Sequence, residues 1–286
     1  MPINEYGFLG KDIKQHEDNL LAKYNEVFDF YEEFNHFLHK IHDKTGLKND
    51  DFQGAMITRT FTKSLTTFQA VYKLFRHHFC NNAENLCRVL FEEMVNVCYC
   101  VLGINEAKRF YSLEIIIALK IINEVNNPKN KEYFTESDKE KYFEKKSYSE
   151  MKKDLINILR SLEVKDIFNK NNKPVAMSLE ERVNRIDSKA IGQHYKTFYR
   201  VASIGVHSLP DLMGRYLIYD KNGLLKKVLW GPESEDCEIR SIFVSIHFMI
   251  ISLEYIQKYF KYPKKEDISK FWGKTQELGY KYKYFI

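Results

Sequence analysis

The sequence predicts an all-α fold, a bundle of long helices with one small β-hairpin. Only 12 glycines and 6 prolines occur among the 286 residues. This is about half the usual share of these turn formers, which favours long helices. Apolar residues recur at steps of three and four over long stretches, which is the helical period. Only Asn222-Gly223, between two short apolar runs, has the pattern of a hairpin turn.

We expect residues 1–286 to form a single helical domain, although their number would also allow two small ones. A chain of this length buries about three quarters of its unfolded surface, so it needs neither disulfides nor a structural metal to stay folded. Residues 1–48 contain the first long helix, from about residue 11 to 44, and Gly46 follows its end. Its apolar stripe has a 3.5-residue period, which predicts packing at a shallow angle against neighbouring helices. The stripe consists of Leu20, Tyr24, Val27, Tyr31, Phe34, Leu38 and Ile41.

Residues 50–125 are predicted to form three core helices. Asp50 or Asp51 caps the first, which runs to about Phe79. The second spans about 81–103 and the third about 105–125, ending before Pro128. Residues 126–148 are charged and poor in aliphatic side chains, which is typical of a mobile connection or a solvated helix.

Residues 149–262 are predicted to form further core helices together with the hairpin. A short amphipathic helix covers about 149–163. Ser178 with Glu181 has the capping-box pattern, which opens helical segments that extend through Tyr195 and on toward His207. A last core helix spans about 237–260. Residues 263–286 form a tail rich in Lys and Tyr, which could stack on bases, although a solvated helix with a frayed end is the better interpretation.

Composition and charge exclude several classes of protein. The net charge is +5 and the sequence pI is about 8.7. This mildly basic charge permits a polyanionic partner, but it is much smaller than the positive charge of a dedicated nucleic-acid-binding protein. The longest apolar run, residues 242–253, is too short to cross a bilayer, and no secretory signal is present. Five cysteines are an odd number without an export signal. We therefore expect a cytoplasmic protein with reduced thiols that does not enter a membrane.

One segment carries a polar stripe that could perform chemistry. On a helix, Lys196, Arg200, Ser203 and His207 share one side. Arg can hold a phosphate and His can move a proton near neutral pH, so the stripe could form a phosphodiester site. The alternative is an ordinary helix surface with a His near its C-terminus. The spacing alone favours this second interpretation.

A second candidate combines Arg88 and Glu92, four residues apart on one helix, with Arg59 on the preceding helix. They could be a structural ion pair that orients two helices. They could also support the residues between Arg200 and His207, and the sequence does not decide between these interpretations.

The histidines and cysteines do not form a recognisable metal site. Two groups contain metal-ligating residue types: His77, His78, Cys80 and Cys87, and the stripe His36, His39 and His42. Neither has the ligand spacing of a zinc site, so buried inert cysteines and a solvated histidine face are expected. Nucleotide-binding, zinc-protease and serine-hydrolase motifs do not occur. We expect no cofactor and no metal.

Two stretches, residues 57–99 and 194–217, resemble a bacterial helical family, domain of unknown function 5677. Members combine an R-x5-L helix and an R-x-L-x-E helix with a later Y-R-x-x-S-x-x-x-H segment. The corresponding residues here are Arg59, Arg88, Glu92, Tyr199, Arg200, Ser203 and His207. The resemblance covers about the middle 160 residues.

The last segment is also similar to the Arg-x4-6-His signature of the HEPN superfamily, helical-bundle proteins of prokaryotic defence and toxin systems. This resemblance implies a metal-independent endoribonuclease of a homodimer, acting in antiphage defence or growth arrest. His207 would transfer protons and Arg200 would steady the scissile phosphate of RNA. The residue after the arginine is often polar in these nucleases and is Val201 here. A catalytically silent sensor or scaffold that binds a protein or RNA partner is therefore the alternative.

Overall fold

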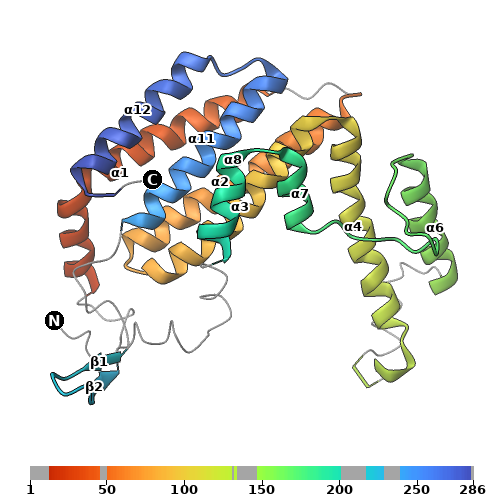
Figure 1. The fold of residues 1–286 in the computed structure, drawn as a ribbon, viewed down its shortest axis with the longest axis horizontal. Helices are drawn as coiled ribbons and strands as arrows, with labels where there is room; N and C mark the ends of the chain where they lie inside the picture. Colours follow the sequence, from red (N-terminus) through yellow and green to blue (C-terminus); the bar gives the residue numbers. More distant parts are fainter. Residues whose placement is uncertain are drawn as a thin grey trace.

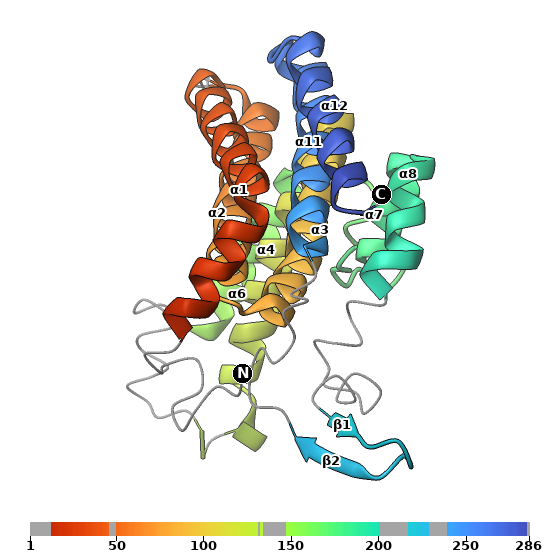
Figure 2. The same cartoon turned by 90° about the vertical axis from the view of Figure 1, so that its left-hand side faces the viewer.

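The computed structural model describes residues 13–45, 50–130, 132–133, 147–200, 217–228 and 239–284. Over these residues the chain is a helical bundle with one two-stranded hairpin, which confirms the predicted fold class (Figure 1). The long helices of the bundle lie lengthwise beside one another (Figure 2). They are α1 (Ile13–Lys44), α2 (Phe52–Arg76), α3 (Cys80–Leu102), α11 (Arg240–Phe260) and α12 (Lys265–Lys281).

Helix α1 buries the whole predicted apolar stripe, from Leu20 to Ile41. It is kinked at Tyr24, whose φ of −125° and ψ of 24° are not helical. Asp51 is the N-cap of α2, where its carboxylate accepts a hydrogen bond from the Gly54 amide at 2.7 Å. The capping prediction is therefore confirmed for Asp51.

Helix α11 is the centre of the bundle. Every residue from Ser241 to Leu253 is buried, because α2, α3 and α12 all pack against this helix. The Tyr31 hydroxyl joins three helices: it donates to the Phe68 carbonyl at 2.7 Å and lies 3.1 Å from the Ser245 hydroxyl. Within the described residues, no helix has the length and apolar character needed to span a bilayer.

The interpretation of the C-terminal tail as a solvated helix with a frayed end is wrong for α12, because one face of this helix is buried. Ile268, Phe271 and Leu278 are buried against the core, and Phe271 contacts the rings of Phe34 and Phe37 on α1 at 4.9 and 4.6 Å. The apolar residues at i, i+3 and i+10 gave a helical signal that the many lysines and tyrosines obscured.

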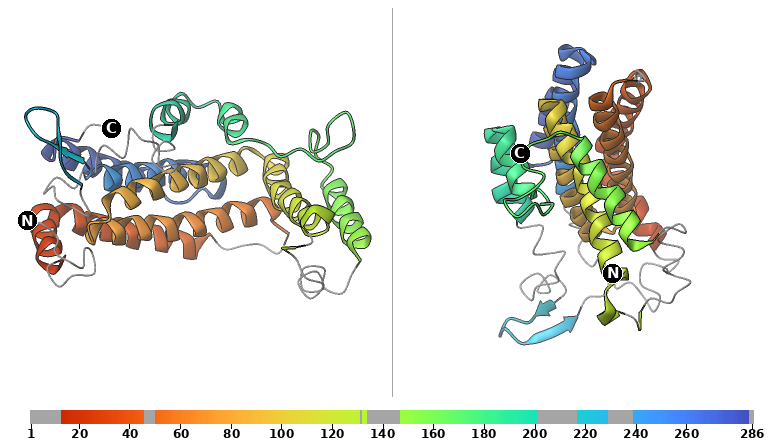
Figure 3. Two further views of the ribbon diagram at one scale, coloured as in Figure 1. Left: turned by 90° about the horizontal axis from the view of Figure 1, so that it is seen from below. Right: turned by 90° about the vertical axis from the view of Figure 1, so that its right-hand side faces the viewer.

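Helix α4 (Ile104–Val125) links the bundle to a second, smaller apolar cluster. Its C-terminal half packs on α6 (Tyr148–Ser161), and Figure 3 shows these two helices at one end of the molecule. Ile116, Leu119 and Leu159 belong to this cluster and are separate from the main core. Most of the predicted connection 126–148 lies outside the described residues; Pro128–Asn130 form the 3₁₀ turn η2.

The helical segments predicted from Ser178 toward His207 are three short elements up to Tyr199, and residues 201–207 lie outside the described part of the chain. The three elements are α7 (Leu179–Ile186), α8 (Lys189–His194) and the π-helical turn η3 (Tyr195–Tyr199). The capping box of Ser178 and Glu181 is confirmed. Asp187 adopts the left-handed conformation with φ 50°, which ends α7, and Ser188 then caps α8. An Asp-Ser pair stops the helix because both side chains bond readily to the local backbone.

The hairpin is confirmed. Strands β1 (Leu217–Tyr219) and β2 (Leu225–Val228) pair antiparallel. The Asp220 carboxylate accepts bonds from the amides of Asn222 and Leu224, and Gly223 has a φ of 77°, which favours glycine.

Candidate functional site

Arg88, Glu92 and Tyr199 meet at the junction of α3 and η3. The Tyr199 hydroxyl donates to a Glu92 oxygen at 2.8 Å and accepts from the Arg88 guanidinium at 3.1 Å. The same arginine nitrogen lies 3.6 Å from the Glu92 carboxylate, one helical turn away on α3. The structure therefore brings together three of the predicted site residues, although 107 residues of chain separate Glu92 from Tyr199.

Aromatic packing fixes Tyr199 as firmly as its hydrogen bonds do. Its ring stacks on Tyr195 and contacts Phe91, both at 5.4 Å, and the Arg88 guanidinium lies 5.0 Å from the ring centre. Burial raises the pKa of the hydroxyl; the bond from Arg88 opposes this shift, and the bond to Glu92 adds to it. Tyr199 is therefore a neutral anchor at neutral pH.

Arg200 directly follows this anchor. Its backbone amide donates to the Tyr195 carbonyl, five residues earlier, and so closes the π-helical turn. Isolated π-helical turns are rare in proteins, and those that occur are often found at functional sites. The Arg200 side chain is 60% exposed, lies 3.6 Å from the Glu180 carboxylate, which is 55% exposed, and rests over the Tyr195 ring at 5.4 Å. An exposed pair at this distance is weak, so an anionic ligand can replace Glu180.

Ser203 and His207 lie outside the described residues, so the structure does not place them relative to Arg200. Arg59 does not join the cluster. It forms an exposed ion pair with Glu114 on α4, at 2.9 and 3.1 Å, on another part of the surface. The pair with Glu114 agrees with the structural ion pair that was one of the two interpretations, and support of His207 by Arg59 stays a prediction because His207 is outside the described residues. Helical spacing on α2 could not show which neighbouring helix the arginine meets.

Two buried arginines near the site were not predicted. Arg109 donates to the Val175 carbonyl at 2.9 Å, and Arg182 donates to the Met177 carbonyl at 3.1 Å. Burial lowers the pKa of both guanidinium groups. They hold the extended chain that leads into α7, and so position Glu180 opposite Arg200. In the sequence, Arg182 is distinguished only by its place beside the apolar Val183 in a short helix. This pattern is too common to predict a buried arginine.

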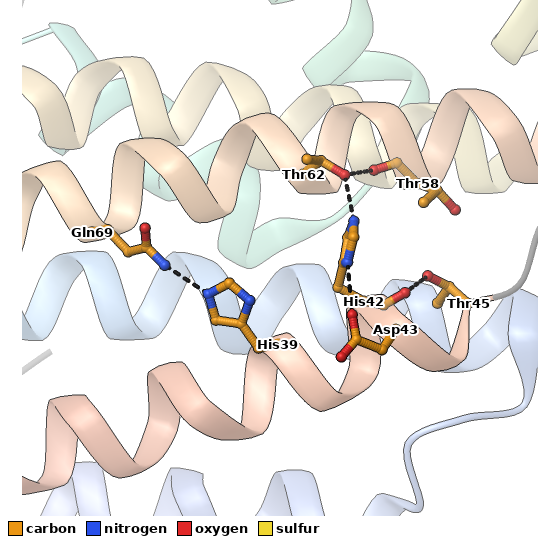
Figure 4. Close-up of polar contacts among 7 residues, drawn as sticks. All are labelled: His39, His42, Asp43, Thr45, Thr58, Thr62 and Gln69. Atoms are coloured by element: carbon orange, nitrogen blue, oxygen red, sulfur yellow. Dashed lines mark hydrogen bonds and ion pairs between the residues drawn. The ribbon is translucent and has the colours of Figure 1, made fainter.

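The histidines of α1 make ordinary side-chain contacts with α2 (Figure 4). The Gln69 amide nitrogen lies 2.7 Å from Nε2 of His39, so His39 accepts this bond. Thr62 gives its hydroxyl proton to the Thr58 carbonyl at 2.8 Å, so its oxygen accepts from Nε2 of His42 at 3.0 Å. These histidines fasten α1 to α2.

The second histidine group is also used for packing. His77 lies 2.5 Å from the Glu17 carboxylate, and His78 contacts the His16 carbonyl at 2.7 Å. Cys87 is free and buried, but Cys80 is disulfide-bonded, which corrects the expectation that every thiol is reduced. Among the described residues, no group of three or more His, Cys, Asp or Glu side chains is arranged to hold a metal ion.

Comparison with known proteins gives a family and no function. No curated protein and no solved structure matches the chain. One family model, Family of unknown function (DUF5677), matches residues 54–224, which is more than half of the chain. The match runs from α2 through the Arg88, Glu92 and Tyr199 cluster to the turn of the hairpin. The chain therefore belongs to the DUF5677 family.

Proposed function

We propose that this protein is an endoribonuclease of the HEPN type that cuts RNA without a metal ion, with Arg200 and His207 as its catalytic residues. The observation that carries the proposal is the exposed guanidinium of Arg200 directly after the anchored Tyr199. The anchor restricts where the arginine can reach, and its weak pair with Glu180 leaves it available for a phosphate.

The chemistry explains why two chains would be needed. Attack by the ribose 2′-hydroxyl on the adjacent phosphate requires a base, an acid for the leaving 5′-oxygen, and a cation for the developing negative charge. One chain offers one Arg200 and one His207, whereas a homodimer doubles both. Antiphage defence or toxin-type growth arrest is the biological setting that this activity would serve.

RNA cleavage tests the proposal directly. Purified wild-type protein is incubated with total RNA in excess EDTA, and the fragments are examined for 2′,3′-cyclic phosphate ends. We expect cleavage by the wild type and none by His207→Ala or Arg200→Ala. Arg185→Ala is the matched control, because Arg185, in α7, is also exposed and pairs with Asp166 at 3.6 Å, the same distance as the Arg200 pair. Equal cleavage by wild type and His207→Ala would refute the proposal.

The second candidate is a silent helical module that binds a protein or RNA partner. It is favoured by the way Arg88, Glu92 and Tyr199 satisfy one another, as a structural network would. This function predicts no RNA cleavage by any variant, together with loss of partner binding in Arg200→Ala. A catalytic wild type would exclude it.

A further inference from the structure

Two histidines from distant parts of the chain form a direct contact beside the candidate site. His194 is the last residue of α8, and His247 lies in the buried middle of α11. Their Nε2 atoms are 2.8 Å apart, and their rings meet edge to face at 4.7 Å. Because one nitrogen must donate and the other accept, the contact requires that only one of the two Nε2 atoms carries a proton.

The surroundings of this pair are apolar. The Trp272 ring of α12 lies 5.0 Å from His247, and the Phe248 ring lies 5.6 Å from His194. Of the described side chains, His194 is the only titratable group that acts on His247. Burial first, and then repulsion from His194, lower the pKa of His247 to about 3; burial also lowers the pKa of His194. Both rings are therefore neutral at neutral pH.

The free nitrogen of His247 identifies the tautomer. Its Nδ1 is buried and has no hydrogen-bond partner among the described residues. A buried N–H without an acceptor is costly, so the proton belongs on Nε2, where it has one. His247 therefore donates to His194, and the proton of His194 is on Nδ1. This pair is also a poor metal site, since a third ligand and an acceptor for Nδ1 are both missing from the described part of the chain.

Proton uptake by His194 would break the contact in its present tautomer. His194 is partly exposed, whereas His247 is only 8% exposed, so solvent protons reach His194 first. A proton on Nε2 of His194 removes its acceptor lone pair and places two N–H groups against each other. The contact would survive only if the proton of His247 moved to its buried Nδ1, which has no acceptor among the described residues. The apolar rings around the pair offer no counter-charge, so separation of the two helices is the favoured response.

We propose that the bond between His247 and His194 is a proton-operated latch that holds α8 on α11 and opens on mild acidification. His194 directly precedes the π-helical turn that carries Tyr199 and leads to Arg200. Opening the latch therefore moves the anchor of the candidate site. This inference goes beyond the proposed function, because it requires neither RNA nor cleavage.

The sign of the pH effect follows from the lowered pKa values. A histidine in the unfolded chain has a pKa of about 6.5. Below that pH the two histidines bind protons in the unfolded state but not in the latched state. The free energy of unfolding of the latched state therefore decreases as the pH falls. For His247 this window extends down to about 3.

Hydrogen exchange of backbone amides tests the latch in the full-length protein without RNA. Protection factors, corrected for the intrinsic pH dependence of exchange, are measured between about pH 8 and about pH 5. We expect protection of residues 189–199 to fall at the acid end while α1 stays protected. His194→Gln should remove this pH dependence, because Gln cannot become charged there. His42→Gln, on the other side of the bundle, should retain it.

Fluorescence provides a second readout. Trp230 and Trp272 are the two tryptophans, so a Trp230→Phe background isolates Trp272, which contacts His247. A change in Trp272 emission that parallels the loss of protection, and that disappears in His194→Gln, supports the latch. Protection of residues 189–199 that does not change with pH, or an identical change in His194→Gln, would overturn it. Neither result depends on whether the protein cuts RNA.

Discussion

The two sides of α3 contact their neighbours in different ways. Toward α2 and α11 the helix presents apolar side chains such as Leu90, Met94 and Val97, all fully buried. Toward α7 and η3 it presents Arg88 and Glu92, which bond to Tyr199. The apolar side is stabilised by burial, which has no preferred direction. The polar side depends on a few directional bonds and can change its arrangement when one partner changes its charge.

The largest effect is expected on the apolar side. Phe68 on α2 is fully buried and stacks on Tyr31, with ring centres 4.0 Å apart. We expect Phe68→Ala to lower the free energy of unfolding by about 3–5 kcal/mol, because it leaves a cavity that the packed rings cannot fill. Urea denaturation followed by circular dichroism measures this. Ile117→Ala, at a side chain 54% exposed, is the control and should stay within about 0.5 kcal/mol.

A smaller effect is expected on the polar side. Glu92→Ala removes the carboxylate that accepts from the Tyr199 hydroxyl and pairs with Arg88, at a cost of about 1–3 kcal/mol. In a double-mutant cycle with Tyr199→Phe, the two changes should be coupled by about 1 kcal/mol, because they remove the same bond. Additive effects would show that the bond between Glu92 and Tyr199 does not stabilise the polar side of α3.

Glu93, beside Glu92, is a carboxyl group on the buried side of α3. It is 2% exposed; the Thr67 hydroxyl donates to one oxygen at 3.1 Å, and the other has no partner among the described residues. Burial raises its pKa, against the opposing effects of Thr67 and Lys63. The folded state therefore holds the proton longer than the unfolded state, and stability is lost as the pH rises through the raised value.

Replacement of this carboxyl should reverse the loss. We expect Glu93→Gln to be more stable than the wild type at neutral pH, with the difference disappearing near about pH 4, where an unfolded Glu is protonated. Thermal melts over this pH range measure it. Glu180→Gln, at an exposed carboxylate, should show no such crossing. A wild type that is more stable than Glu93→Gln at neutral pH would mean that the ion pair with Lys63 outweighs burial.

The smallest effect on stability is expected at Arg200. Its pair with Glu180 is exposed and 3.6 Å long, so Arg200→Ala should change the free energy of unfolding by at most about 0.5 kcal/mol. The same substitution should abolish RNA cleavage. A loss of stability as large as that of Glu92→Ala would place Arg200 in the structural network and not in a catalytic site. Urea denaturation and the cleavage assay, run on one preparation, compare the two.

Local sequence patterns predicted most helices to within a few residues. The stripe of α1, the caps at Asp51 and Ser178, and the turn at Gly223 are all encoded by residues close together in the chain. The same approach failed on α12, where lysines and tyrosines obscured an apolar face. This failure concerns a weak local signal, because packing of Phe271 against α1 decided which face of α12 is buried.

The sequence alone therefore determined the all-α class, the positions of the long helices and the family. It also singled out Arg88, Glu92, Tyr199 and Arg200 as candidate residues. Only the tertiary structure decided that Tyr199 bonds to both Arg88 and Glu92, that Arg59 pairs with Glu114, and that His194 meets His247. Helix formation depends on residues three and four apart, whereas these contacts join residues 53 to 111 positions apart. Such pairs form only when the packed core has fixed the helices that carry them.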